Sequence, residues 1–204
     1  MDFEPFRKIA RLSRPIIVTE KLDGTSAVIG ISEPGAIPAG ENIPLKSIET
    51  ADGPVAIYAG SRSRWVYPGK PADNYGFAAW VTENLEDLMQ LGPGRHYGEW
   101  WGRGINRGYG LDHRRFSLFN VSRWGGENRG GAPACCSTVP VLYEGNFTTE
   151  AVDECLEYLD QFGSLAAPGY ERPEGVVVYH SAGGFLLKKT IESDESPKEV
   201  LCAA

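Results

Sequence analysis

Short runs of β-branched residues, interrupted by Gly, Pro and Asp, dominate the first third of the chain and predict strands rather than helices. Residues 16–20 and 25–31 are two such runs, and the turn signal Asp23-Gly24 lies between them. The spacing therefore predicts a β-hairpin, with Lys21 near its turn at the end of a strand.

Two later segments have the three- and four-residue apolar spacing of amphipathic helices. The first spans residues 73–91 and ends at Gly92-Pro93, a stop signal. The second spans residues 148–162, with a threonine as N-cap and its acidic residues on a solvated face. The apolar positions are Phe77, Val81, Leu85, Leu88 and Met89 in the first, and Val152, Cys155, Leu156 and Leu159 in the second.

The remaining apolar runs are short and are expected to form strands. Residues 33–54 are rich in Pro and Gly and are interpreted as a surface excursion that leads into a strand at 55–61. Residues 174–179 and 185–190 predict a final hairpin. Many short strands, two helices and no repeating β-α-β order indicate an α+β fold with mainly antiparallel sheets and flanking helices. Further strands are expected at 95–101, 115–121 and 139–143.

Composition is typical of one soluble domain. The chain has 204 residues, of which 42% are hydrophobic, enough to bury a core without metals or disulfides. Residues 1–204 are therefore expected to form a single domain. The N-terminal residues contain no continuous apolar run, which predicts a cytoplasmic protein with no membrane partner. The cysteines lack the spacing of zinc ligands and are expected to be free thiols.

Charge is distributed unevenly along the chain. The net charge of −7 argues against non-specific coating of nucleic acid, because such binding depends on many cationic contacts to phosphate. Residues 103–131 nevertheless contain six arginines and two acids, whereas residues 132–204 contain twelve acids and four bases. The basic middle is expected to face a polyanion while the acidic end faces water.

Lys21 is the candidate nucleophile. A lysine becomes a useful nucleophile when burial or a cationic neighbour favours its neutral form, and Lys188-Lys189 on a later strand supplies such neighbours. A lone Lys-x-Asp-Gly string is weak evidence, but an ordered set of strings is strong. The set is Glu20-Lys21-Leu22-Asp23-Gly24, Ser61-Arg62-Ser63-Arg64, Tyr97-Gly98-Glu99, Phe116-Ser117-Leu118-Phe119-Asn120 and Glu174-Gly175-Val176-Val177-Val178.

This ordered set resembles the motifs of covalent nucleotidyltransferases, and its Gly24-Thr25 continuation resembles the nick-sealing RNA ligase family. Residues 74–81 and 96–105 are similar to small phage and bacterial proteins of that superfamily. The resemblance implies an ATP-grasp-like adenylation domain that uses ATP and Mg²⁺, with Mn²⁺ as a substitute. In the implied reaction the lysine takes AMP from ATP, AMP passes to a 5′-phosphate, and a 3′-hydroxyl displaces it to seal the strand.

The resemblance assigns roles around the first two strings. Lys21 carries the covalent AMP, Asp23 helps to orient it, and Glu20 belongs to the nucleotide-binding set. Arg62 matches an arginine that faces the nucleotide or the 5′-phosphate. Arg64 lies on the same strand face two residues later and is assigned to nucleic acid.

The resemblance also assigns two carboxylates and an aromatic ring. Glu99 matches the carboxylate that reads the nucleoside sugar, the alternative being a strand glutamate that faces water. Phe119 matches the aromatic residue that stacks on the base, although a phenylalanine in such a string is more often part of a core. Glu174 matches the residue that holds the divalent cation, the alternative being a pair with Arg172.

The last motif departs from the family pattern. The family has two lysines one residue apart on one strand face, whereas Lys188 and Lys189 are adjacent and must point to opposite faces. Lys188 is the predicted catalytic and phosphate-binding lysine, because Thr190 then occupies the place of the second lysine. The departure bears on the rate of adenylylation rather than on the existence of the site.

RNA with 5′-phosphate and 3′-hydroxyl ends is the expected partner. Arg103 and Arg107, interleaved with aromatic residues, are assigned to strand backbone and splayed bases, the alternative being solvated arginines beside an aromatic core. Too few residues follow Thr190 for an OB-type or helical C-terminal domain. Either end joining needs an accessory protein that supplies end binding, or it proceeds weakly on nicked duplex.

Three other functions stay open at this point. The protein is otherwise a DNA nick ligase, a catalytically silent module that binds nucleotides or RNA ends, or an enzyme that adenylylates something other than a polynucleotide. A silent module has no chemical need for a lysine nucleophile together with both carboxylates. The sequence therefore favours RNA ligation.

Overall fold

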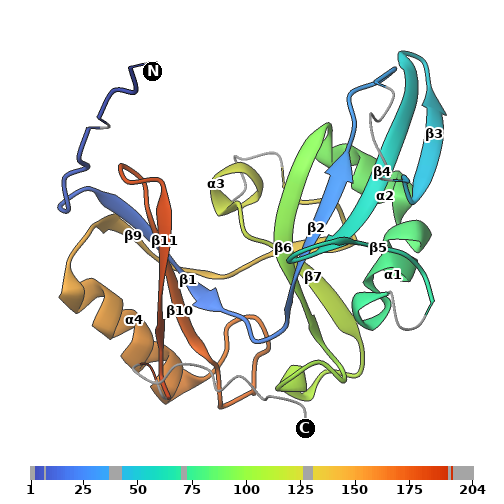
Figure 1. Ribbon diagram of the computed structural model, residues 1–204. Coiled ribbons are helices and arrows are strands. Elements are labelled where there is room, and N and C mark those ends of the chain that lie inside the picture. Colours follow the sequence, from blue (N-terminus) through green and yellow to red (C-terminus); the bar gives the residue numbers. More distant parts are fainter. Residues whose placement is uncertain are drawn as a thin grey trace, which may run out of the picture. The chain divides into compact units, whose positions relative to one another are not determined.

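The computed structural model describes residues 3–6, 8–36, 43–69, 73–125, 131–192 and 194 (Figure 1). Their contacts divide into two compact units. Unit 1 takes its residues from 1–22 and 140–204, and unit 2 from 23–139. Both ends of the sequence therefore contribute to unit 1. That the whole chain acts as one domain stays a prediction.

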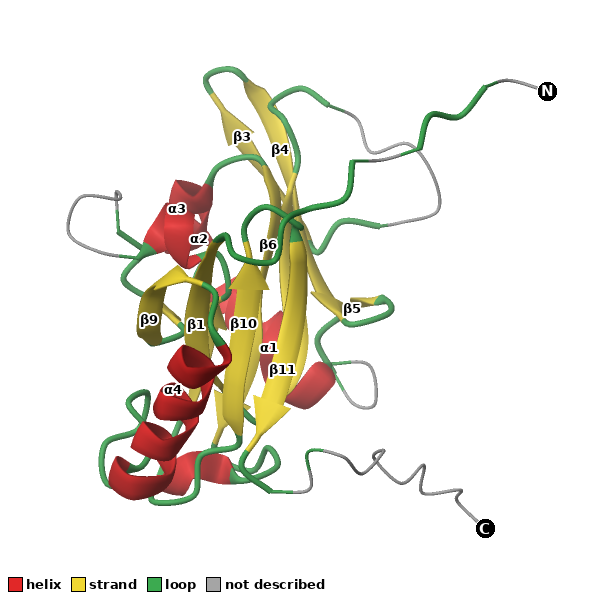
Figure 2. Ribbon diagram, turned by 90° about the vertical axis from the view of Figure 1, so that its left-hand side faces the viewer, coloured by secondary structure: helices red, strands yellow, loops and turns green. Residues whose placement is uncertain are grey.

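Unit 1 is an antiparallel sheet with one helix packed against it. In its described part the strand order is β11-β10-β1-β9. Strand β1 (Pro15–Lys21) pairs with both β10 (Gly175–His180) and β9 (Val141–Asn146), while β11 (Phe185–Thr190) pairs with β10. Helix α4 (Thr149–Phe162) lies along β1 and β10 in Figure 2.

Alternate positions of these strands build the core of unit 1. Ile16 and Val18 of β1 are buried together with Val176 and Val178 of β10, and Leu159 of α4 packs against them. The side chains between these positions must point to the opposite face of the sheet. Each strand of unit 1 therefore has one face committed to α4 and one face that is not.

Unit 2 is a larger sheet, and its helical segment at residues 77–91 packs against one face. Over the described ranges the strand order is β3-β4-β2-β6-β7-β8, with β5 paired to β4, and only β7 and β8 are parallel. The strands are β2 (Thr25–Ile31), β3 (Lys46–Thr50), β4 (Gly53–Ser61), β5 (Trp65–Val66), β6 (Gly94–Gly102), β7 (Arg114–Leu118) and β8 (Cys136–Thr138).

Aromatic and aliphatic side chains fill the space between the unit 2 sheet and its helices. Phe77 and Leu88, from the helical segment, are fully buried against Ile29, Ile57 and Phe116 of three strands. The short helices are η1 (Asn74–Gly76), α1 (Phe77–Glu83), α2 (Leu85–Leu88), η2 (Met89–Leu91), η3 (Gly108–Gly110) and α3 (Val121–Trp124).

The predicted fold class is confirmed: the chain is α+β with mainly antiparallel sheets. The final hairpin is confirmed by the pairing of β10 with β11. The second predicted helix is confirmed as α4, and its N-cap is Thr148, whose side chain accepts a hydrogen bond from the Ala151 amide at 3.0 Å.

The first predicted hairpin is wrong. Strands β1 and β2 do not pair with each other, because β1 belongs to the sheet of unit 1 and β2 pairs with β4 and β6 in unit 2. The Asp23-Gly24 string is not a hairpin turn but the point at which the chain enters unit 2. Local residue preferences identified both strands and could not identify their partners, which come from distant parts of the sequence.

The first predicted helix is interrupted rather than continuous. Asn84 leaves helical geometry at φ −115° and ψ 24°, and its side-chain amide donates to the Trp80 carbonyl at 2.8 Å. Asparagine competes in this way with the backbone for hydrogen bonds, so the segment breaks into α1 and α2. The predicted stop is confirmed, because Gly92 ends η2 with a positive φ of 70°.

The strands also differ from the expectation at three places. Residues 33–54 include β3, which pairs with β4, so this excursion is partly a hairpin, with 37–42 outside the described residues. Strand β7 ends at Leu118 and is followed by α3, and β8 was not predicted. No helix in the described part of the chain is long and apolar enough to cross a membrane.

Candidate active site

The predicted nucleophile lies at the C-terminal end of β1, beside one of the two predicted carboxylates. Lys21 is opposite Gly175 in the β1–β10 register, so it adjoins the residue that precedes β10. Its Nζ donates to Oε2 of Glu174 at 2.5 Å, and both side chains are largely buried. The partner that the structure gives to Glu174 is therefore Lys21.

Strand register decides which of the two adjacent lysines shares a face with Lys21. Lys188 is opposite Val177, which is opposite Thr19, and Thr19 and Lys21 are two residues apart on β1. Directly opposite residues of antiparallel strands project to the same face. Lys188 therefore projects to the face of Lys21, and its catalytic and phosphate-binding role stays a prediction.

Lys189 lies on the opposite face of the sheet, toward α4. Its Nζ donates to Oδ1 of Asp153 on α4 at 2.5 Å. This hydrogen bond raises the pKa of Lys189 above its ordinary value. Lys189 thus connects β11 to the helix, and the pairing accounts for a lysine at this position without reference to a ligand.

Glu20 also lies on the α4 face, although it precedes Lys21 in sequence. Its carboxylate accepts hydrogen bonds from the Ser164 hydroxyl at 2.5 Å and from the Leu165 and Ala166 amides at 2.9 and 3.0 Å. The side chain is 1% exposed, and this burial raises the pKa of Glu20. The carboxylate holds the loop that follows α4. The nucleotide contact assigned to Glu20 stays a prediction.

In unit 2, Asp23 is held by the loop between β6 and β7. Its Oδ1 accepts from the Asn106 side-chain amide at 2.9 Å, and its Oδ2 accepts from Nε of Arg107 at 3.1 Å. The Asp23 backbone amide donates to the Tyr109 hydroxyl at 2.8 Å. Arg107 therefore helps to hold Asp23 in place, and the nucleic-acid contact assigned to it stays a prediction.

Gly24 is held in the same way and has no space for a side chain. Its amide donates to Oε1 of Glu99 at 3.1 Å, and its carbonyl accepts from Asn106 at 2.7 Å. A Cβ at this position would collide with the Trp100 backbone oxygen and the Trp101 side chain. The glycine of the first motif is therefore required by close packing against β6.

Sequence analysis did not identify Asn106 and Tyr109 as contributors to this arrangement. Both have left-handed backbones, with φ of 43° and 52°, which is uncommon for residues other than glycine. Such strain persists only where surrounding contacts hold it, and it concentrates at functional sites. The available signal was the Gly-rich composition of residues 102–110.

Glu99 and Phe119 share the face of the unit 2 sheet that is turned away from α1 and α2. Their sequence neighbours, Trp100 on β6 and Leu118 on β7, point to the other face and belong to the core. Phe119 continues the β7 register, its amide donating to the Tyr97 carbonyl at 3.0 Å, and its side chain is 41% exposed. This exposure favours the stacking role over a core role.

The other predicted arginines lie at the surface of unit 2. Arg62 and Arg64 are exposed in the connection between β4 and β5. Arg103 is exposed as well, and its Nη1 donates to the Asp112 carbonyl at 3.3 Å. The nucleotide and nucleic-acid contacts of these three residues stay predictions.

Few carboxylates are available to a metal ion at this site. Across the described ranges no group of three or more His, Cys, Asp and Glu side chains is arranged to hold an ion. Mg²⁺ in nucleotide-dependent enzymes is usually bound by one or two carboxylates together with substrate phosphates and water. A single protein carboxylate, that of Glu174, is therefore compatible with the predicted cation.

The fold and these motifs define a nucleotidyltransferase-like chain, and comparison with known proteins identifies its family. A family model described as RNA ligase matches residues 14–190. The chain belongs to the RNA ligase family. Comparison with curated proteins gave no match.

Solved structures of an RNA ligase from Naegleria gruberi share the fold. One variant with ATP and Mn has a TM-score of 0.57 at 19% identity, covering 88% of this chain and 50% of that one. A second, also with ATP and Mn, has 0.54 at 19%, covering 86% and 48%. A third, with AMP and Mn, has 0.54 at 18%, covering 88% and 50%. The chain thus spans about half the length of these proteins.

Proposed function

We propose that this protein is an ATP-dependent RNA ligase that forms a lysyl-AMP intermediate on Lys21. AMP then passes to the 5′-phosphate of an RNA end, and a 3′-hydroxyl displaces AMP to seal the strand. The observation that carries the proposal is the Lys21–Glu174 pair at a strand end, with Lys188 on the same sheet face. The family match and the similar structures with ATP and Mn support it.

The proposed first step requires Lys21 to become a neutral amine. An ammonium has no lone pair, so a proton must pass from Nζ to water before attack, and Oε2 of Glu174, at 2.5 Å, accepts a hydrogen bond from Nζ and orients the amine. The Nζ lone pair then bonds to the α-phosphorus of ATP. The bond from that phosphorus to the bridging oxygen breaks, and pyrophosphate leaves with the electron pair.

Charge neutralisation is the second requirement of the reaction. Lys188 is exposed on the face of Lys21, where its ammonium can offset charge that develops on the phosphates. A carboxylate has about four lone-pair sites, so Glu174 keeps acceptor capacity for a divalent cation beside its contact with Lys21. A bound Mg²⁺ or Mn²⁺ would neutralise phosphate charge.

The nucleoside roles follow from side chains in unit 2. Glu99 is proposed to contact the ribose, Phe119 to stack on the base, and Arg62 to contact a phosphate. Asp23 acts as a positioning residue, because its carboxylate is tied to Asn106 and Arg107. An accessory protein for end binding and a cytoplasmic location remain parts of the proposal.

The proposal is tested by incubating the purified protein with α-labelled ATP and Mg²⁺ and resolving it on a denaturing gel. We expect a labelled protein band that is absent in Lys21→Ala and retained in the matched variant Lys189→Ala. Label in Lys21→Ala would refute the assigned nucleophile. An unlabelled wild-type protein across metals and pH values would identify a silent binding module instead.

A chase with unlabelled ends identifies the acceptor. We expect the label to pass to nicked RNA that carries a 5′-phosphate, and sealed product to follow. Transfer to DNA alone would identify a DNA ligase, and transfer to neither would indicate another acceptor. Labelling by GTP in place of ATP would indicate a different nucleotide requirement.

A further inference from the structure

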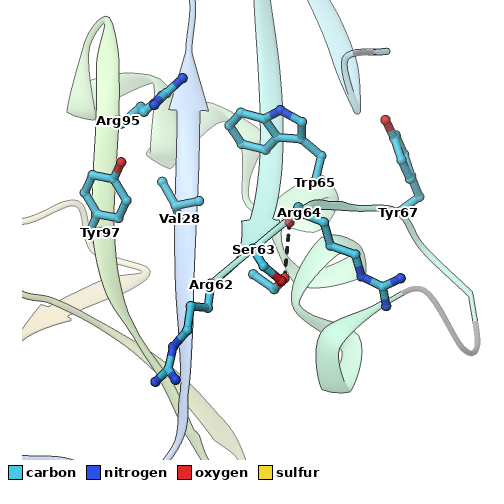
Figure 3. Close-up of a pocket in the computed structure, with 9 residues that line it drawn as sticks. Val28, Arg62, Ser63, Arg64, Trp65, Tyr67, Arg95 and Tyr97 are labelled. Carbon is cyan, nitrogen blue, oxygen red and sulfur yellow. Dashed lines mark hydrogen bonds between the residues drawn. The ribbon is translucent and has the colours of Figure 1, made fainter. Parts of the chain in front are cut away.

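A basic and aromatic pocket opens on the unit 2 sheet face that also carries Tyr97. Its volume is about 600 Å³, within the range of sites that hold one small ligand. Strands β2 and β6 and the β4–β5 connection line it (Figure 3). The side chains that shape it are Val28, Arg62, Arg64, Trp65, Arg95 and Tyr97.

The floor of this pocket depends on two glycines. Trp65 lies over Gly30 and Gly60, where an added Cβ would come within 3.0 Å of its ring. Val28 lies between the strand of Tyr97 and the indole in Figure 3. Side chains at the glycine positions would displace the indole. The pocket is therefore built by the sequence of β2 and β4 and is not a gap left between elements.

The wall of the pocket is strongly cationic. Arg62, Arg64 and Arg95 are all exposed, and none has an ion-pair partner within the residues that the structure describes. In Figure 3 their side chains extend to separate places around the pocket rather than converging on one point. Separated guanidinium groups match the repeated charges of a phosphodiester backbone better than a single compact phosphate.

An aromatic ring is available beside these charges. Tyr97 follows Arg95 by two residues on β6, so the two side chains share a face, and Tyr97 is 52% exposed. Phe119 continues the register opposite Tyr97 and is exposed on the same face. Exposed rings next to arginines are the arrangement by which proteins stack bases of single-stranded or splayed nucleic acid.

We propose that this pocket binds a nucleotide of the RNA substrate: one base stacks on Tyr97, and Arg95 and Arg64 contact the flanking phosphates. Arg95 and Tyr97 thereby gain a role that none of the sequence motifs assigns to them. The proposal rests on the proposed function in its choice of RNA as the polyanion. The ATP phosphates are the competing occupant, and the test separates the two.

The test measures binding of a fluorescent nicked RNA with a 5′-phosphate, by anisotropy, without ATP. We expect Arg95→Ala and Tyr97→Ala each to weaken binding about tenfold, while Tyr97→Phe, which keeps the ring, stays within about twofold. The matched control is Lys46→Ala, which removes one exposed charge of the same unit at β3. It is expected to stay within about twofold.

Two further readouts separate a binding role from a structural one. Arg95→Ala should lower the slope of log Kd against log salt by about 1, the value for one lost phosphate contact, whereas Tyr97→Ala should leave the slope unchanged. Self-adenylylation by free ATP should stay within about twofold of wild type in both variants. Their thermal unfolding, compared with that of Tyr97→Phe, shows whether a loss of binding reflects a loss of folded protein.

Three results would overturn the proposal. These are wild-type protein that does not bind the RNA, variants that bind it as wild type does, and losses confined to self-adenylylation, which would assign the pocket to ATP. Because binding is measured without ATP, its outcome is independent of labelling at Lys21. Failure of the RNA pocket and failure of the ligase proposal are therefore distinguishable.

Discussion

The two faces of the unit 1 sheet carry similar charged residues and use them differently. On the α4 face, the Glu20 carboxylate is saturated by a loop and Lys189 is paired with Asp153. On the opposite face, Lys21 pairs with Glu174, and Lys188 has no ion-pair partner in the part of the chain described. Neighbours in sequence thus have separate tasks.

Because successive side chains of a strand point to opposite faces, adjacent charged residues of one strand have different surroundings. On the α4 face, Glu20 is buried and needs its hydrogen-bond donors because an unpartnered buried charge is costly, whereas Lys189 pairs with Asp153 while both are about half exposed. On the opposite face, Lys21 is paired with Glu174, and the exposed Lys188 can meet a ligand. Glu20-Lys21 and Lys188-Lys189 each place one residue on either face. In each pair, one residue contacts other parts of unit 1 and the other is assigned to the proposed reaction.

The largest expected difference lies between the two adjacent lysines. Lys188→Ala should slow single-turnover adenylylation about 100-fold, because a cation at the phosphates is lost. Lys189→Ala should stay within about threefold, because its partner is Asp153. Quenched-flow labelling with α-labelled ATP measures both rates, and Lys188→Arg should recover part of the loss. Equal losses in the two alanine variants would contradict the assignment of faces.

The second effect concerns the stability of unit 1. Glu20→Ala should lower the free energy of unfolding by about 2–4 kcal/mol, because the buried Ser164 hydroxyl and two part-buried backbone amides lose their acceptor. Urea unfolding followed by circular dichroism measures this change. Glu20→Gln, which keeps one acceptor oxygen, should lose less. A change no larger than that of an exposed control such as Glu49→Ala would show that the carboxylate is not structural.

A smaller effect is expected from the pair on the α4 face. Asp153→Ala removes the partner of Lys189, but the two side chains are 50% and 41% exposed, so solvent screens the interaction. Its loss should change the free energy of unfolding by less than about 1 kcal/mol and leave adenylylation unchanged. A fall in adenylylation comparable to that of Lys188→Ala would place Lys189 in the reaction.

The smallest effect is a pH dependence. Burial raises the pKa of Glu20 above 4.5, although hydrogen bonds from Ser164, Ala166 and Leu165 oppose the shift. The stability contribution of this proton is complete below the unfolded pKa and is lost as pH rises through the folded value. Relative to Glu20→Gln, wild type should therefore lose stability as pH rises from about 4.5. The opposite slope in urea unfolding would contradict this.

Part of the site could be predicted because its signals are local. Lys21 does end a strand, as the short string around it implies, whereas only the structure shows that close packing requires glycine at position 24. Asn106 and Tyr109 could not be predicted, because their contribution depends on a loop more than eighty residues from Asp23 meeting it in space. For the same reason the shared pocket of Arg95 and Tyr97 could not be predicted, because its other lining residues lie far from them in sequence.

By itself the sequence determined where most of the strands and helix α4 form and in what order the candidate site residues occur. These properties depend on residue preferences and spacing within a few positions, which every segment carries with it. Only the tertiary structure decided that β1 and β2 belong to different sheets, that Lys188 rather than Lys189 shares the face of Lys21, and that the Glu20 carboxylate accepts hydrogen bonds from the loop after α4. Such facts depend on register between distant strands, and no local pattern encodes that register.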